Sequence, residues 1–183
     1  MLAFQPFDDS TLLQAAPDGS TVVLVERRAP ERSGEGRFQV VKFRSDGGVV
    51  YRRWVAFSAL PVTEETLQAR LELPEGPLAE RFPSPATALR ALREAIFVPR
   101  FHPPVTDLAV GRDGTAWVRR EDAGAPLVRW MVLNPRGELL AEVKAPAALR
   151  ILQADGDRVW GVETDDMGVP TVVRFRGQRG GER

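Results

Sequence analysis

Hydrophobic residues occur along this chain in short runs that are separated by turn-forming residues. The run 12–16 meets the turn 17–20, and the β-branched run 21–25 follows. Asp and Gly tolerate the positive φ that tight hairpins require, and β-branched residues suit a pleated surface. The pattern predicts an antiparallel hairpin, which two more runs around the turn 45–48 extend to a four-stranded meander within residues 11–57.

The same turn motif occurs three times in the sequence. Asp18-Gly19, Asp113-Gly114 and Asp155-Gly156 each end one apolar run and begin another, and a glutamate follows each Asp by eight positions (Glu26, Glu121 and Glu163). A turn that recurs in register with its strands indicates an internal repeat. The second copy predicts four strands within residues 105–145, and the third predicts an incomplete set of three within 149–177.

Between the first two copies, the alternating pattern gives way to helical signals. Thr63 precedes Glu64, an acid that suits the first turn of a helix, and Ser84-Pro85 places a capping residue before a proline at the first helical position. Apolar residues then recur at helical spacing. We expect an α-helical insertion over residues 61–100 that interrupts the repeat without ending it.

Four-stranded meanders leave both faces of each sheet without cover, and radial stacking of such sheets into a β-propeller covers them. The predicted fold class is therefore all-β with a helical insertion, specifically a single partial β-propeller of about three blades. Propellers typically have about four to eight blades. We therefore expect either half of a propeller from a longer chain or a homodimer in which two chains complete the ring.

Composition narrows the class of partner. The 183 residues include 25 basic and 25 acidic side chains, so no net charge attracts nucleic acid or an anionic membrane. The chain has no cysteine, which excludes disulfides and thiolate chemistry but leaves the compartment undecided. Residues 1–6 lack the features of a signal peptide, and no run approaches the roughly 20 apolar residues that cross a bilayer. We expect no nucleic-acid partner and no membrane span.

Several segments resemble the C-terminal blades of bacterial six-bladed β-propellers of the NHL or TolB-like type. They are residues 103–110, Arg112-Asp113-Gly114, Trp117-Val118, and residues 130–137, 155–157, 159–162 and 172–176. The resemblance implies a propeller fold, and a periplasmic or extracellular location if an upstream part exists. It implies no single activity, because such propellers include hydrolases and binding proteins.

In a propeller, the loops between second and third strands open on the same face as the connections into the inner strands. That face is predicted to hold the insertion, residues 100–102 and the loops 27–37, 121–126 and 164–169. His102 is the only histidine, it titrates near neutrality, and it lies at the entrance to an inner strand. A structural histidine bonded to a neighbouring loop is the alternative interpretation.

The candidate ligand-binding residues are Arg100, His102, Asp165 and Asp166; no catalytic residue, metal site or cofactor is predicted. Asp165 and Asp166 place two carboxylates on one loop, but a calcium site needs about six to eight oxygens, which favours a solvated turn. Arg27, Arg28, Arg32 and Arg37 could bind an anionic ligand or partner, but Glu26, Glu31 and Glu35 are interleaved with them and favour a self-neutralising surface. Trp54, Trp117, Trp130 and Trp160 could form a carbohydrate-stacking set, but three of them recur inside strands, where packing is the ordinary role.

Three functional hypotheses stay open. The preferred one is a non-catalytic propeller module that binds a protein, peptide or small ligand through its loop face. The second is part of a metal-assisted hydrolase of the lactonase kind, with metal ligands drawn from several blades. The third is a structural fragment without independent activity. No nucleophile elbow, phosphate loop or dinucleotide fingerprint occurs in the sequence, so an enzyme is not favoured.

Overall fold

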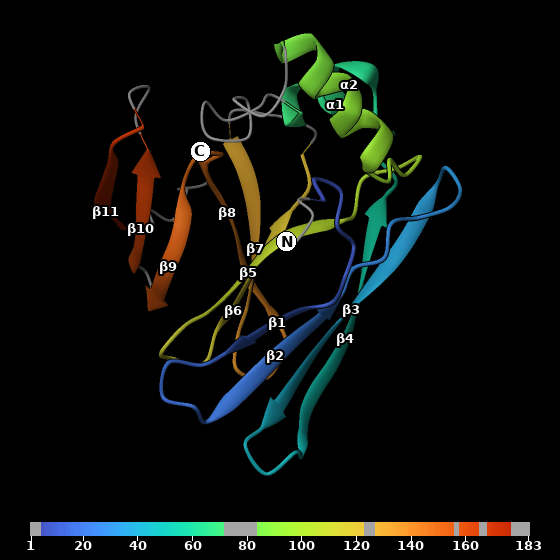
Figure 1. Cartoon of the computed structure of the whole chain (residues 1–183). Coiled ribbons are helices and arrows are strands. Elements are labelled where there is room, and N and C mark those ends of the chain that lie inside the picture. Colours follow the sequence, from blue (N-terminus) through green and yellow to red (C-terminus); the bar gives the residue numbers. More distant parts are fainter. Residues whose placement is uncertain (1–4, 72–83, 123–126, 156–157, 165–167, 177–183) are drawn as a thin grey trace, which may run out of the picture.

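The structure is a computed structural model that describes residues 5–71, 84–122, 127–155, 158–164 and 168–176, apart from the side chains of Pro85, Leu89 and Leu92. The described residues form three antiparallel sheets and two short helices (Figure 1). The predicted all-β class with a helical insertion is therefore confirmed.

Each sheet is a meander whose strands pair in chain order. The first sheet contains β1 (Leu12–Ala15), β2 (Thr21–Glu26), β3 (Glu35–Arg44) and β4 (Val49–Ser58). The second sheet contains β5 (Val105–Val110), β6 (Ala116–Arg120), β7 (Leu127–Leu133) and β8 (Leu139–Pro146). The third sheet contains β9 (Arg150–Asp155), β10 (Arg158–Thr164) and β11 (Pro170–Arg176). Helices α1 (Glu64–Arg70) and α2 (Pro85–Ala95) lie between β4 and β5 in the chain.

The first two Asp-Gly turns share one side-chain arrangement. The hydroxyl of Ser20 donates to Asp18 Oδ1 over 2.7 Å, and the hydroxyl of Thr115 donates to Asp113 Oδ1 over the same distance. The glycine after each Asp has a positive φ, +71° in the first turn and +76° in the second. The repeated motif therefore encodes a repeated turn, because Asp fixes the local backbone while Gly tolerates its left-handed conformation.

Both helices begin at the residues that the sequence predicts. The Thr63 hydroxyl accepts a hydrogen bond from the backbone N–H of Thr66, whose own side chain bonds back to the Thr63 N–H in a capping box. The Ser84 hydroxyl accepts from the backbone N–H three residues further on, over 3.2 Å. An ion pair between Glu64 and Arg93 joins the two helices.

The second sheet is covered on both faces. One face packs on the first sheet in a cluster that includes Val23, Val25, Phe38, Val40, Leu108, Val118, Met131 and Leu133. The other face packs on the third sheet in a cluster that includes Trp117, Trp130, Val132, Ala154 and Val159. The first strands of the sheets adjoin, since β5 contacts both β1 and β9. The three sheets therefore stack in chain order with their first strands together.

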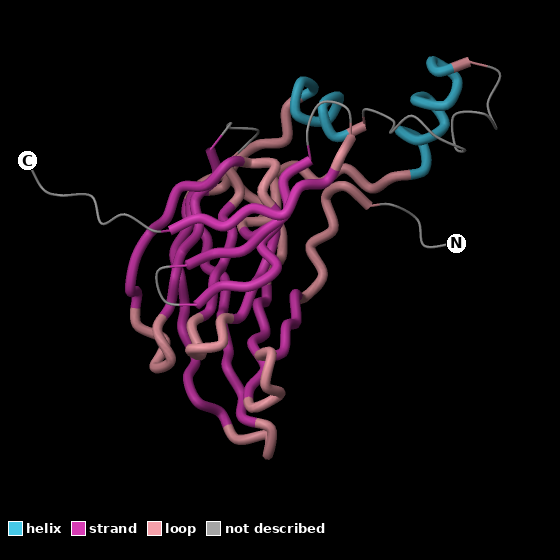
Figure 2. The backbone as a smooth tube through the Cα atoms, turned by 90° about the vertical axis from the view of Figure 1, so that its left-hand side faces the viewer, coloured by secondary structure: helices cyan, strands magenta, loops and turns pink. Residues whose placement is uncertain are grey.

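Two cations of the first sheet reach the turns of the second sheet. Lys42 Nζ donates to the carbonyl oxygen of Gly114 over 2.7 Å, and Arg53 Nη1 donates to that of Gly137 over 2.9 Å. Burial lowers the pKa of Lys42, with Asp113 and Asp18 opposing this shift. These bonds tie the hairpin ends of the two sheets together. The helices lie at the opposite end of the sheets (Figure 2).

The tryptophans do not share one environment. Trp117 and Trp130 are buried between the second and third sheets, which confirms their predicted packing role. Trp54 is 59% exposed, so the packing interpretation is wrong for this residue. It pairs with Gln39 on the face of the first sheet that points away from the second sheet. Strand periodicity placed Trp54 on a sheet, but no described element covers that face.

Candidate functional site

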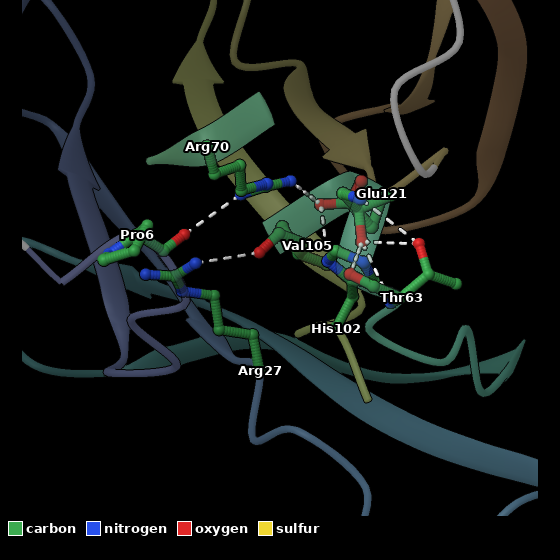
Figure 3. Close-up of polar contacts among 8 residues, drawn as sticks. Pro6, Arg27, Thr63, Arg70, His102, Val105 and Glu121 are labelled. Atoms are coloured by element: carbon green, nitrogen blue, oxygen red, sulfur yellow. Dashed lines mark hydrogen bonds and ion pairs between the residues drawn. The ribbon is translucent and has the colours of Figure 1, made fainter. Parts of the chain in front are cut away.

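A polar cluster lies where α1 meets the end of β6 (Figure 3). Arg70, the last residue of α1, places Nη2 2.5 Å from Oε2 of Glu121 and donates from Nη1 to the carbonyl oxygen of Pro6 over 3.0 Å. Its guanidinium also lies 5.4 Å from the ring centroid of Phe7. Arg70 therefore connects the N-terminal segment, the helical insertion and the second sheet.

His102 lies beneath this cluster and is only 1% exposed. Its Nδ1 is 3.9 Å from Oε2 of Glu121, and its ring centroid is 5.4 Å from that of Phe7. Neither ring nitrogen has a hydrogen-bond partner among the described residues. Burial lowers the pKa of His102; the Glu121 charge opposes this shift, while Arg70 adds to it. The imidazole is therefore neutral at physiological pH.

An open cavity of about 520 Å³ lies beside the cluster. Beside Gln5 of the N-terminal segment, the polar residues that line it are Arg70, Thr106, Arg119, Arg120, Glu121 and Asp122. They come from α1, from β5, and from the end of β6 with the residues that follow it. The volume falls within the range of about 300 to 1,000 Å³ that small-molecule sites occupy.

The acidic groups of the cavity have cationic partners. Glu121 pairs with Arg70, and Oδ1 of Asp122 accepts from Nε and Nη2 of Arg129 over 3.0 and 2.8 Å. The hydrogen bond and charge of Asp122 raise the pKa of Arg129. The remaining arginines of the lining, Arg119 and Arg120, therefore give the cavity a net positive character.

Those two arginines differ in their surroundings. Arg120 lies with its guanidinium 5.3 Å from the ring centroid of Phe38, and burial lowers its pKa. The side chain of Arg119 makes no hydrogen bond or ion pair with the described part of the chain. Its charge acts on Asp107, which lies opposite it in the sheet and whose pKa burial raises. The Thr106 hydroxyl is also buried without a partner among these residues. Arg119 and Thr106 therefore retain hydrogen-bonding capacity at the cavity.

Arg27 is an exception to the predicted self-neutralising surface, whose other arginines and glutamates are exposed. Its side chain is buried, and it donates to the carbonyl oxygens of Ser10 over 2.7 Å and Val105 over 2.9 Å. It also pairs with Asp8 at 3.2 Å. Arg27 therefore anchors the segment before β1 to the start of β5.

Of the predicted binding residues, the structure describes Arg100 and His102, and it places them in different environments. Arg100 is exposed, its carbonyl oxygen accepts from the backbone N–H of Val62 over 3.0 Å, and it does not line the cavity. His102 is buried next to Glu121. Asp165 and Asp166 lie outside the described residues.

Sequence reasoning missed the residues that line the cavity. Arg119, Arg120, Glu121 and Asp122 form one charged run at the end of a predicted strand, and that run was the available signal. Arg70 gave no comparable signal, because it reaches the site only through the folding of the insertion.

Metal-binding clusters and membrane-spanning helices are both absent from the described residues. No group of three or more His, Cys, Asp or Glu side chains is placed to hold a metal ion within them. No helix within them has the length and apolar character needed to span a membrane.

Comparison with known proteins gave no relative for this chain: no family model matches it, and no match was found among curated proteins or among solved structures. The residues of the site are thus the basis for its interpretation.

Proposed function

We propose that this chain is a three-bladed portion of a β-propeller, of the NHL or TolB-like type, that works as a non-catalytic binding module. The blade interpretation is supported by the chain-order stacking of the sheets and by the adjoining inner strands β1, β5 and β9. The repeated turn of Asp18 and Asp113 adds to it. The loop face, which carries the insertion and the cavity, is the binding face.

The ligand that we propose is a small molecule or peptide with a carboxylate or phosphate group. The observation that carries this proposal is the side chain of Arg119, which lines the cavity and has no hydrogen-bond or ion-pair partner among the described residues. A guanidinium offers several N–H donors in a planar fork that matches these anions. Glu121 and Asp122 already have arginine partners, and burial raises the pKa of Asp107, the acid opposite Arg119 in the sheet. These three acids therefore do not fully cancel the attraction of Arg119 for an anion.

Thr106 and Arg70 would assist Arg119. The buried Thr106 hydroxyl can bond a polar ligand atom without breaking a bond to another described residue. Arg70 faces the same cavity while it holds Glu121, so an anion there would lie near a second guanidinium. The predicted ligand roles of Arg100, His102, Asp165 and Asp166 stay predictions, and His102 would act indirectly through Glu121.

The test uses inorganic phosphate, succinate and citrate as probes, with binding measured by calorimetry and by thermal shift at low and moderate salt. We expect at least one probe to bind the native chain, and Arg119→Gln to weaken that binding at least tenfold, because it removes a charge-assisted bidentate contact. Added salt should weaken binding to the native chain as well, because screening acts on charge attraction.

Arg136→Gln is the matched control. It removes the same charge from an exposed turn of the second sheet, between β7 and β8, and Arg136 does not line the cavity. Its affinity for the probe should equal that of the native chain. Equal affinities in Arg119→Gln and the native chain, or failure of all three anions to bind, would contradict the proposal.

A further inference from the structure

The stack of three sheets has two open faces. On the first sheet, the open face carries Leu13, Val22, Leu24 and Trp54 together with Arg52. On the third sheet, it carries Trp160, Val162 and Val172 together with Arg174. No described element covers either face. Leu13 is 65% exposed and Val172 is 71% exposed. Apolar surfaces of this kind in contact with water usually mark an interaction site.

Equivalent residues of the three sheets show what each open face lacks. In each sheet, one residue at or next to the start of the second strand pairs with the end of the first strand across the hairpin, and we call it the closing position. It is Thr21 in the first sheet, Thr115 in the second and Arg158 in the third. The residue after this closing position faces the preceding sheet: Ala116 is buried against the first sheet, and Val159 against the second.

In the first sheet, the residue after the closing position is Val22, and it is only partly buried. The next residue along each strand faces the following sheet. Val23 is buried against the second sheet, and Trp117 is buried against the third. Trp160 holds the equivalent position in the third sheet and is only partly buried. Trp117 and Trp160 are thus the same residue at the same place in consecutive sheets, and the difference between them is the covering sheet.

The two open faces are therefore of complementary type. In the second and third sheets, one face packs on the sheet that precedes it in the chain, and the first sheet exposes this face. In the first and second sheets, the other face packs on the sheet that follows, and the third sheet exposes that face. We infer that a second copy of this chain covers both, with the third sheet of each copy packed on the first sheet of the other.

Twofold symmetry would then close a ring of six sheets, within the usual range of about four to eight blades. One partner chain can cover both open faces only if the ring closes. If it does not close, the same contact repeats from chain to chain and forms a filament. A second copy is the occupant favoured here because the chain itself carries both of the matching surfaces.

The test is the mass of the native chain in solution, measured by light scattering after size exclusion and by sedimentation equilibrium over a wide concentration range. The chain has a mass of 20.2 kDa, and we expect a particle of two chains that does not grow with concentration. A monomer at every concentration would overturn the inference, and so would particles larger than two chains.

Two variants separate this arrangement from other dimers. Val172→Glu alters the open face of the third sheet, and Leu13→Glu alters that of the first; both side chains are largely exposed, so the fold of one chain should persist. In the closed ring, either change affects both interfaces, and each variant should become monomeric with an unchanged circular dichroism spectrum.

Leu140→Glu is the control, because Leu140 is 58% exposed on the edge strand β8 of the covered second sheet. It should remain a dimer. Persistence of the dimer in Val172→Glu or in Leu13→Glu would overturn the inference. Anion binding at Arg119 is measured in a separate experiment. A result that overturns the dimer would therefore not decide the proposed function.

Discussion

The ring of Tyr51 lies directly against Gly137, so that a Cβ atom at position 137 would lie 2.6 Å from Cγ of the tyrosine. Tyr51 belongs to β4 of the first sheet, whereas Gly137 lies in the turn between β7 and β8 of the second. The glycine also has a φ of +83°, which side-chain-bearing residues rarely adopt. Position 137 therefore requires glycine both for the turn and for the contact between sheets.

Gly137→Ala should consequently destabilise the fold more than the same change at Gly47. Gly47 has a φ of +84° in the turn between β3 and β4, but a Cβ atom added there would meet no described atom within 4 Å. Backbone strain should lower the free energy of unfolding of both variants by about 1 kcal/mol. Overpacking against Tyr51 should lower that of Gly137→Ala by about 1 to 3 kcal/mol more. Urea unfolding of both variants checks this, and equal losses would contradict it.

Tyr51 is the only tyrosine, so its ionisation can be followed directly by absorbance. Burial raises its pKa to about 12, although Arg53 opposes the shift. The unfolded chain loses this proton near pH 10, so the stability that the protonated hydroxyl supports is complete below pH 10 and is lost as pH rises toward 12. A titration midpoint near 10 in the folded protein would contradict this prediction.

Tyr51→Phe supplies the matching variant. The buried hydroxyl has no hydrogen-bond partner among the described residues, so its removal should not destabilise the protein at neutral pH. The stability difference between the native chain and the variant should widen in favour of phenylalanine above pH 10. Unfolding measured in urea at several alkaline pH values tests both statements.

Local structure was predictable from the sequence where neighbouring residues determine it. The turns depend on Asp18 and Asp113 with the hydroxyl two positions later, and α1 depends on the cap at Thr63. These contacts join residues within a few positions of one another. Their signals therefore appear in the sequence without knowledge of how the sheets stack.

The candidate site depends on contacts between residues that are far apart in the sequence. Arg70 and Glu121 are 51 positions apart, and Arg27 reaches the carbonyl oxygen of Val105 across 78 positions. Tryptophan burial follows the same rule, since Trp54 and Trp117 both lie in strands and only Trp117 is covered by a further sheet. Alternation predicts a strand, but packing decides which of its faces is buried.

The ion pair between Arg70 and Glu121 should contribute more to stability than the pair between Arg129 and Asp122. Both members of the first pair are the more buried: Glu121 is 5% and Arg70 32% exposed, against 11% for Asp122 and 52% for Arg129. Removing one member of a buried pair costs about 3 to 5 kcal/mol, while exposed pairs contribute about 0 to 1 kcal/mol. We therefore expect Arg70→Met to destabilise the fold strongly and Arg129→Met to have little effect.

Double-mutant cycles isolate the pair itself. Glu121→Gln added to Arg70→Met should recover part of the lost stability, because the buried carboxylate is then gone. Asp122→Asn added to Arg129→Met serves as the reference cycle, with a coupling energy below about 1 kcal/mol. Equal coupling energies in the two cycles would show that the burial of Glu121 has no energetic consequence.

His102 is the only histidine, so its titration can be followed by NMR without assignment ambiguity. Because burial lowers the folded-state pKa of His102, the unfolded chain binds a proton more readily as pH falls below about 6.5. The stability that the neutral imidazole supports is therefore complete above about pH 6.5 and is lost as pH falls toward the folded-state pKa. The free energy of unfolding should fall by no more than about 1.4 kcal/mol per pH unit, and His102→Phe should remove this pH dependence.

Glu121→Gln should lower the pKa of His102 further, because the Glu121 charge is the group that opposes the burial shift. The two side chains are 3.9 Å apart, so the effect requires no rearrangement of the cluster. Asp122→Asn removes a charge from the adjacent residue, which is not among the causes of the His102 shift, and should leave the titration unchanged. A rise in the His102 pKa in Glu121→Gln would mean that the Arg70 guanidinium, once released, moves away from the imidazole.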